Sequence, residues 1–445
     1  RGLDQWDAVL ANLREALEIY TNLGDREMVV GSFARLTAAL VSARRFQEAI
    51  ETGHRGLAYL QEDVSALRVR LLAPLAEALA AVGAYAPAQE ALREALKIAS
   101  QLSDSKLEAR LLGARSTVNF HYFRLKEAAA DGLRSEQQGA SEASPWRRAA
   151  QLRVLQQTLM YLGRMEEALR IADELEPLAR KIGQSYEVAL CESVRAWAEF
   201  AKAPDLAKFE IGLKKMPKSD QTAWAAYWEA LSEVLLSLLD FLRGNWTSAL
   251  LHAQAASRHP ELGSSRYGVG TLFRQMAYAG DRDAALAILE EERTRLPHSG
   301  QLNSRGWSLM LALVIEGLVM LGERSRAGEL YPLVRELVDT GAIVLWPISR
   351  FTQTVAGIAA AAARQWDTAE EHFQSAMQQA ESLPHLLEQA EIRRFHAMML
   401  IDRAGPGDRE KAQTLLREAL ESYTQIGMPR HIEMTQTLLG QTTGG

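Results

Sequence analysis

The sequence contains a single cysteine, Cys191, and no apolar run long enough to cross a membrane. One cysteine excludes an intrachain disulfide and any zinc site built from clustered cysteines. A membrane-spanning helix needs about 18 or more apolar residues in a row, so none is expected. With 50 lysines and arginines against 56 aspartates and glutamates, the chain also lacks the basic excess that general nucleic-acid binding requires. We therefore expect a cytoplasmic protein that binds neither membrane nor nucleic acid.

Signatures of catalysis are also missing. None of the nine histidines stands four residues from another, as in a helical zinc site. The glycine-rich stretch Gly263–Thr271 lacks the Gly-Lys-Ser or Gly-Lys-Thr ending of a phosphate-binding loop, and no Gly-x-Ser-x-Gly elbow occurs. Cys191 lies between Leu190 and Val194 and is expected to be a small buried residue. We predict no enzymatic activity, no metal site and no cofactor.

Strand patterns are scarce as well. Sustained alternation of apolar and polar residues is absent, while alanine, leucine, glutamate and arginine, all good helix formers, dominate. Apolar residues instead recur three and four positions apart, as on one face of a helix. One such stripe consists of Trp224, Trp228, Leu231, Leu235, Leu238 and Leu242. No low-complexity linker divides the chain, and the sequence predicts an all-α protein.

A four-residue pattern recurs along the chain: an opening residue, usually large, then two variable residues and a small residue. Its copies begin at Trp6, Phe46, Tyr85, Leu125, Met165, Trp246, Arg282, Arg324, Trp366 and Arg409. Successive copies are 36 to 43 residues apart, except for one gap of 81 residues that predicts a degenerate copy near Asp205–Met216. A steady period of this size indicates an array of like structural units.

Glycines precede the pattern, and small residues follow it. A glycine stands two residues before six of the copies, at Gly83, Gly163, Gly244, Gly280, Gly322 and Gly407. Glycine readily adopts the left-handed conformation that ends a helix. Each unit is therefore predicted to be a first helix, a glycine turn and a second helix that opens with the pattern. The residues four and seven positions after the small residue are usually apolar or small, as are Phe373 and Ala376 after Ala369, and small residues at that spacing would let a neighbouring helix approach closely.

This arrangement resembles the tetratricopeptide repeat superfamily, most clearly at Trp366, Ala369, Phe373 and Ala376. The resemblance implies a right-handed α-α superhelix of about eleven helix pairs. The period near 40 residues departs from the family's value of about 34. The first-helix signature also departs, since only Gly357 fits its glycine, while Thr37, Gln156 and Phe273 stand at equivalent positions. We predict one array over residues 1–440 and a disordered tail over residues 441–445.

The C-terminal stretch carries a narrower resemblance. The runs Glu391–Leu400, Gly405–Ala412, Leu415–Tyr423 and Ile426–Glu433 are similar to the repeat regions of large bacterial signalling regulators with an upstream STAND or AAA nucleotide-binding domain. That resemblance implies the sensor or interaction region of a signal-transduction or transcription regulator, with any nucleotide-binding domain outside this chain. The start at Arg1, without a methionine, favours a piece of a longer protein. The alternative is a general assembly scaffold that binds partner peptides in its concave groove.

Aromatic residues outside the repeat pattern are concentrated in the middle of the chain. In helical repeats the first helices line the concave surface, where partners bind, and aromatics and arginines are frequent anchors. The predicted groove for a protein or peptide partner, or for a small-molecule inducer, consists of Trp197, Trp224, Tyr227, Trp228, Arg274, Arg305, Trp307, Trp346 and Arg350. The alternative is that these rings are core residues. A second candidate is the cluster of Lys202, Lys208, Lys214, Lys215 and Lys218, either a solvated helix or a docking site for an acidic segment.

Overall fold

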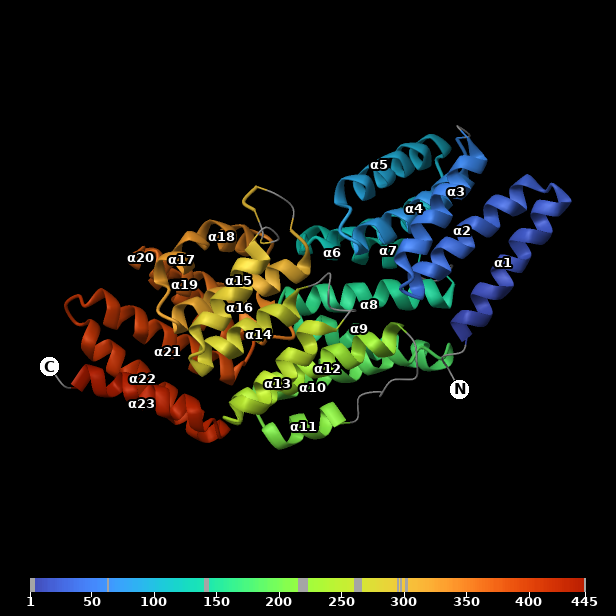
Figure 1. The fold of residues 1–445 in the computed structure, drawn as a ribbon. Helices are drawn as coiled ribbons and strands as arrows, with labels where there is room; N and C mark the ends of the chain where they lie inside the picture. Colours follow the sequence, from blue (N-terminus) through green and yellow to red (C-terminus); the bar gives the residue numbers. More distant parts are fainter. Residues whose placement is uncertain are drawn as a thin grey trace. The chain divides into compact units, whose positions relative to one another are not determined.

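The computed structural model describes residues 5–61, 64–139, 144–214, 223–259, 266–293, 296, 298–300 and 303–443. Within these ranges the chain is a succession of α-helices joined by short turns, with one two-stranded ribbon (Figure 1). The predicted all-α class is therefore confirmed. None of the helices in these ranges combines the length and the apolar character that a membrane span requires.

The chain divides into two compact units. Unit 1 comprises Arg1–Leu159, Glu166–Cys191 and Lys218–Ala226, and unit 2 comprises Met160–Met165, Glu192–Pro217 and Tyr227–Gly445. The single uninterrupted array over residues 1–440 stays a prediction.

Unit 1 is a stack of helix pairs. The helices that lie mainly in it are α1 (Gln5–Leu23), α2 (Arg26–Ser42), α3 (Phe46–Leu60), α4 (Ala66–Ala81), α5 (Tyr85–Leu102), α6 (Ser105–His121), α7 (Leu125–Gly139), α8 (Pro145–Tyr161) and α9 (Met165–Lys181). α2 packs against α3, α4 against α5 and α6 against α7, and the first helices α2, α4 and α6 also pack on one another (Figure 1). The first helices therefore form one continuous layer.

Unit 2 continues the same pairing with one interruption. Its helices are α10 (Ser185–Lys202), α11 (Leu206–Lys214), α12 (Ala223–Leu242), α13 (Trp246–Arg258), α14 (Tyr267–Ala279), α15 (Arg282–Glu292), α16 (Arg305–Met320), α17 (Arg324–Glu329), α18 (Tyr331–Asp339), α19 (Thr352–Ala362), α20 (Trp366–Ser382), α21 (Leu386–Arg403), α22 (Asp408–Ile426) and α23 (Pro429–Thr443). The short α11 is the predicted degenerate copy. α23 runs through Thr443, so residues 441–443 are helical where a disordered tail was predicted, and residues 444–445 lie outside the described ranges.

The predicted repeat register is confirmed. The second helices α3, α5, α7, α9, α13, α15, α17 and α20 begin at the predicted residue, and α22 begins one residue early, at Asp408. In nine of the ten copies the small residue has no exposed surface: Ala49, Ala88, Ala128, Ala168, Ala249, Ala285, Ala327, Ala369 and Ala412. A larger side chain there would hold neighbouring helices apart. In the first copy Val9 stands at this position and is 38% exposed. α1 opens the described chain without a first helix before it, so the described helices form ten complete pairs between α1 and α23 rather than eleven.

The turn between paired helices is left-handed at the predicted position. All six predicted glycines have positive φ, from 71° at Gly163 to 89° at Gly83. Three copies place another residue there in the same conformation: Arg44, Phe123 and Arg364, with φ between 57° and 60°. Helix packing therefore imposes the turn, and glycine only removes the steric cost of adopting it.

The two-stranded ribbon was not predicted. β1 (Val344–Leu345) pairs antiparallel with β2 (Arg350–Phe351) between α18 and α19. It follows the repeat whose second helix is broken at Leu330, just before Pro332. Strands of two residues are too short to leave a period-two pattern in the sequence. The ribbon is buried, and the backbone N–H of Ile343 beside it donates to the carbonyl oxygen of Tyr161 at 2.8 Å.

We predict opposite effects for two helical glycines in unit 2. A Cβ at Gly357 would lie 2.8 Å from the Phe373 ring, whereas a Cβ at Gly212 would come no closer than 4.0 Å to Ala196. Gly357→Ala should lower the free energy of unfolding by about 1–3 kcal/mol through overpacking. Gly212→Ala should leave it unchanged or raise it by up to about 1 kcal/mol, because alanine is the better helix former. Urea unfolding followed by circular dichroism measures both, and equal effects would contradict the packing described here.

Candidate functional site

The structure buries most of the predicted groove residues inside unit 2. Four aromatic side chains are at least nine-tenths buried: Trp197, Tyr227, Trp228 and Trp346. Trp307 is half-buried against the core around Phe273, and Arg305 on the same helix is also half-buried. Trp224 lies on α12, but its side chain is outside the described residues. The four buried rings are core residues, as the alternative interpretation has it. Contact of the predicted residues with a partner stays a prediction.

The first helices of unit 2 meet the ribbon and one another instead of leaving an open surface. The Tyr161 hydroxyl donates to the carbonyl oxygen of Trp346 at 2.8 Å, and Nε1 of Trp197 donates to Oγ of Ser349 at 3.0 Å. At the C-terminal end, the ring of His431 on α23 lies 5.0 Å from that of Phe241 on α12. Trp197 and Trp346, two of the predicted groove residues, therefore have partners within the unit.

Arg350 has acidic partners, but they belong to the chain itself. Its Nη1 donates to Glu388 Oε2 at 2.9 Å, and its Nη2 donates to Glu391 Oε2 at 3.0 Å. Nε and Nη2 both donate to Glu316 Oε2, at 3.0 and 2.8 Å. Burial alone would lower the pKa of Arg350, but the three carboxylates hold it well above its usual value. The predicted pairing with an acidic group of a ligand is therefore met internally.

A second buried arginine extends this cluster. Nη2 of Arg394 donates to Glu391 Oε2 at 2.8 Å and to the Tyr278 hydroxyl at 2.9 Å. The Tyr423 hydroxyl donates to the other oxygen of Glu391 at 2.5 Å. Burial opposes ionisation of Glu391, but Arg394 and Arg350 hold its pKa well below the usual range. The predicted Arg274 lies close by, buried, with its guanidinium 4.9 Å from the centre of the Phe241 ring. The ionic core, defined as Arg274, Glu316, Arg350, Glu388, Glu391 and Arg394, is formally neutral.

The other chemical candidates give no open site in the described residues. Cys191 is fully buried, with Nε2 of Gln156 3.8 Å from its sulfur. No group of three or more metal-ligating side chains gathers in the described part of the chain. In the lysine cluster, Lys208 pairs with Glu199 at 2.6 Å and Lys214 with Glu210 at 2.5 Å. Lys215 and Lys218 lie outside the described residues.

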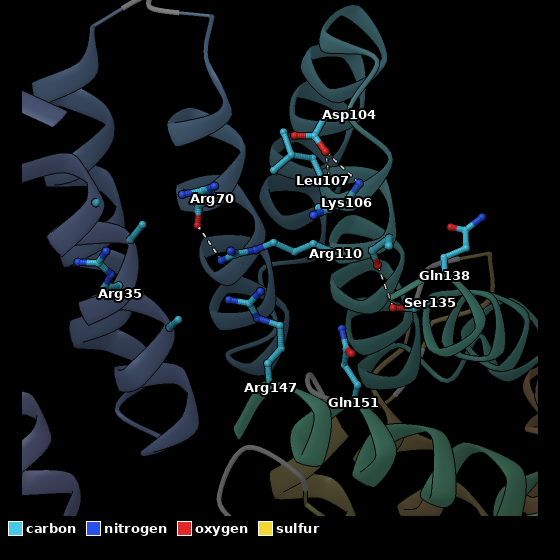
Figure 2. Close-up of a pocket in the computed structure, with 14 residues that line it drawn as sticks. Arg35, Arg70, Asp104, Lys106, Leu107, Arg110, Ser135, Gln138, Arg147 and Gln151 are labelled. Carbon is cyan, nitrogen blue, oxygen red and sulfur yellow. Dashed lines mark hydrogen bonds between the residues drawn. The ribbon is translucent and has the colours of Figure 1, made fainter. Parts of the chain in front are cut away.

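Unit 1 contains a cavity of about 510 Å³ on the face formed by its first helices. Helices α2, α4, α6 and α8 contribute one cation or more each to its wall: Arg35, Arg70, Lys106, Arg110 and Arg147. Asp104 is the one acidic residue of the lining. Figure 2 shows these side chains around a common space between the helices. We call this cavity the arginine groove.

Local contacts fix the walls of the arginine groove. The Asp104 carboxylate caps α6, because its Oδ1 accepts from the backbone N–H groups of Lys106 at 2.9 Å and Leu107 at 3.2 Å. Arg110 extends from α6 towards α4, where its Nη2 donates to the carbonyl oxygen of Arg70 at 3.3 Å (Figure 2). The cap therefore fixes the start of α6, and the Arg70 carbonyl oxygen holds the Arg110 guanidinium.

One glycine brings α8 against α6 at the floor. A Cβ at Gly113 would lie 2.1 Å from Nε2 of Gln151, so only glycine leaves room for that amide. Oγ of Ser135 on α7 donates to the carbonyl oxygen of Ala109 at 2.9 Å. These contacts join α6, α7 and α8 at one side of the arginine groove.

The described lining of the groove has five cations and one carboxylate, Asp104, and Glu77 lies near Arg110 and Arg147. Among the described residues, none of Arg35, Arg70, Arg110 and Arg147 forms an ion pair. Burial and the neighbouring Arg147 lower the pKa of Arg110 to about 9, against the raising effect of Glu77. Burial also lowers the pKa of Arg147, and it raises that of Glu77. A bound anion would offset both the free-energy cost of burying these charges and their mutual repulsion.

Sequence reasoning from aromatic residues missed this groove. The available signal is an arginine on each successive first helix, because Arg35, Arg70, Arg110 and Arg147 are spaced by 35, 40 and 37 residues. That spacing matches the repeat period, so the side chains can converge on one face. The signal is weak in a chain with 50 lysines and arginines.

Comparison with known proteins gives distant structural likenesses. No protein-family model matches the chain, and no curated protein matches it. A Rap protein complexed with competence and sporulation factor is 11% identical with a TM-score of 0.42, over 93% of this chain and 97% of that one. RapI in its apo form is 13% identical with a TM-score of 0.44, over 76% and 98%. The APC/C hetero-tetramer Cut9–Hcn1 is 14% identical with a TM-score of 0.46, over 99% and 93%. Likenesses this low carry no argument about family or function, and the helical-pair repeat rests on the chain's own helices.

We predict that the ionic core is required for the stability of unit 2. Glu391→Gln removes the charge that Arg350 and Arg394 share, and breaking a buried ion pair costs about 3–5 kcal/mol. The matched control is Glu418→Gln on α22, a half-exposed carboxylate paired with Arg393, for which a loss below about 1 kcal/mol is expected. Urea unfolding of the two variants decides the matter, and similar losses would contradict a structural role for the cluster.

We also predict that acid weakens unit 2 through buried histidines. Burial lowers the pKa of His385 to about 3, and those of His396 and His431 to about 4. The unfolded chain takes up these protons below about pH 6.5 and the folded one does not, so stability falls as the pH falls from there towards the folded values.

His385→Asn tests this at one site. Nδ1 of His385 accepts from the backbone N–H of Glu388 as a helix cap, and asparagine keeps that role without titrating. The change in unfolding free energy between about pH 6 and about pH 5 should be smaller by about 1 kcal/mol in the variant. An unchanged pH dependence would show that His385 is not buried in its neutral form.

Proposed function

We propose that this chain is a non-catalytic, protein-binding helical repeat whose arginine groove binds an acidic segment of a partner protein. The observation that carries the proposal is the set of four arginines on α2, α4, α6 and α8 that form no ion pair with any described residue. The buried Arg350 of unit 2, in contrast, is surrounded by three carboxylates. The missing counter-charges of the groove are therefore expected on a partner.

The chemistry of the groove favours carboxylates carried on a chain. A guanidinium donates two parallel hydrogen bonds to a carboxylate, and such bonds are stronger where water is partly excluded. Arg110 and Arg147 are half-buried, while Arg35 and Arg70 are exposed, so an anion can approach from solvent. A cavity of about 510 Å³ spread over four first helices fits an extended peptide segment.

The wider setting that we propose is the interaction region of a bacterial multidomain signalling regulator in the cytoplasm. Its support is the C-terminal sequence resemblance, and the nucleotide-binding domain of such a regulator would lie outside this chain. A general assembly scaffold is the alternative. The solvent-accessible arginines of the groove suit a peptide partner in either setting, whereas a small-molecule inducer would call for a more enclosed pocket.

We predict that single arginine changes weaken binding of an acidic probe. The probe is a fluorescein-labelled peptide of six glutamates, compared with the same peptide made of glutamines. Arg110→Ala should weaken glutamate-peptide binding by about tenfold or more, because a hydrogen-bonded charge is lost. Raising the salt from about 50 to about 300 mM should also weaken it through screening. Fluorescence anisotropy measures the Kd.

The matched control is Arg134→Ala, an exposed arginine on α7 that does not line the groove. It should bind the glutamate peptide within about twofold of the unaltered protein. Equal binding of the glutamine peptide, or equal losses in the two arginine variants, would sink the proposal.

A further inference from the structure

A second cavity, of about 340 Å³, adjoins the arginine groove within unit 1. Four residues line both spaces: Ala38, Arg110, Arg147 and Gln151. The two cavities are therefore neighbouring compartments with a shared wall, and one extended ligand can enter both.

The walls of the second cavity are more apolar than those of the groove. Trp6 on α1 and Trp146 on α8 meet edge to face, with ring centres 5.5 Å apart and an interplanar angle of 70°. Both indoles are half-buried, and Val9, one turn after Trp6, keeps 38% of its surface exposed. Phe46 at the start of α3 adds a third ring. Large apolar side chains that stay partly exposed around a concave space offer contact area to a ligand.

The charges of the lining residues determine which end of a ligand would be acidic and which apolar. Arg110 and Arg147 line both compartments, and the carboxylates Glu77 and Glu187 line only the second. An acidic group is therefore expected in the groove and an apolar group beside the indoles. On the far wall, Glu187 lies 3.6 Å from Arg153, so that arginine already has a carboxylate close by. A space of about 340 Å³ is at the lower end of known ligand pockets, which suits one or two side chains better than a whole small molecule.

We propose that this cavity, the tryptophan pocket, is a specificity subsite that takes a large aromatic or aliphatic side chain next to the acidic residues of the same partner segment. The inference rests on the proposed function of the arginine groove. It specifies the partner as an acidic segment with a bulky apolar residue at one end, rather than any acidic surface.

The test compares three labelled peptides on the full chain: six glutamates alone, and the same run with one tryptophan added at either the N-terminal or the C-terminal end. One of the tryptophan peptides should bind about tenfold tighter than the glutamate peptide, because burial of an aromatic ring adds to the ionic contacts. Trp146→Ala and Val9→Asp should each remove that advantage and leave the Kd of the glutamate peptide within about twofold. Val9 is exposed, so its variant reports on the pocket without testing the core.

Two further variants serve as controls. Trp146→Phe keeps an aromatic ring and should retain most of the preference. Leu102→Ala removes an apolar side chain of the same unit that is 41% exposed and lines neither cavity, and it should change nothing.

The outcomes separate the two proposals. If all three peptides bind equally, or if the preference survives in both Trp146→Ala and Val9→Asp, the tryptophan pocket is refuted while the arginine groove stands. If no peptide binds, both are refuted. A preference that disappears only with the pocket variants establishes the subsite.

Discussion

Each helix pair depends on one close contact, in which a fully buried alanine lets the second helix touch its neighbours. That contact recurs from Ala49 to Ala412 with no exposed surface at any copy. Because it fixes where each second helix begins, it also fixes the turn before it and the spacing of the first helices. The first helices then present equivalent faces side by side, which is why residues 35 to 40 positions apart in the sequence can share one cavity wall. The shared cavity wall is thus a consequence of the small residues on the second helices.

The parts of the structure that the sequence could predict are those set by local spacing. The start of α3 at Phe46, the left-handed turn at Gly83 and the degenerate copy at α11 all follow from a pattern inside one repeat. The surroundings of Arg350 could not be predicted, because its partners Glu316, Glu388 and Glu391 lie 34 to 41 residues away on other elements. The arginine groove was missed for the same reason. A side chain's role as core or surface depends on how pairs stack, and the repeat pattern alone does not contain that information.

The two sets of arginines show how one residue type takes opposite roles. Arg350 is enclosed by carboxylates from α16 and α21, so its charge is balanced within the fold. Arg110 is half-buried, and burial lowers its pKa first, Arg147 and Arg70 lower it further, and Glu77 opposes them. Cations that lie close together and partly buried lower the stability of the fold. The contrast separates an arginine whose charge is paired within the fold from one that forms no ion pair with any described residue.

The ionic core also changes how the repeat array is connected. In a stack where each pair touches only its neighbours, stability is a sum of local terms and the ends can unravel one pair at a time. Here Arg394 on α21 bonds Tyr278 on α14, which is 116 residues earlier in the chain. Glu316 on α16 and Tyr423 on α22 join the same cluster. Removing α16 or α21 would leave a charge unpaired in the interior, and removing α14 or α22 would leave a buried polar group without its hydroxyl partner. We therefore expect the segment from α14 to α22 to unfold as a single cooperative block rather than as a row of separable pairs.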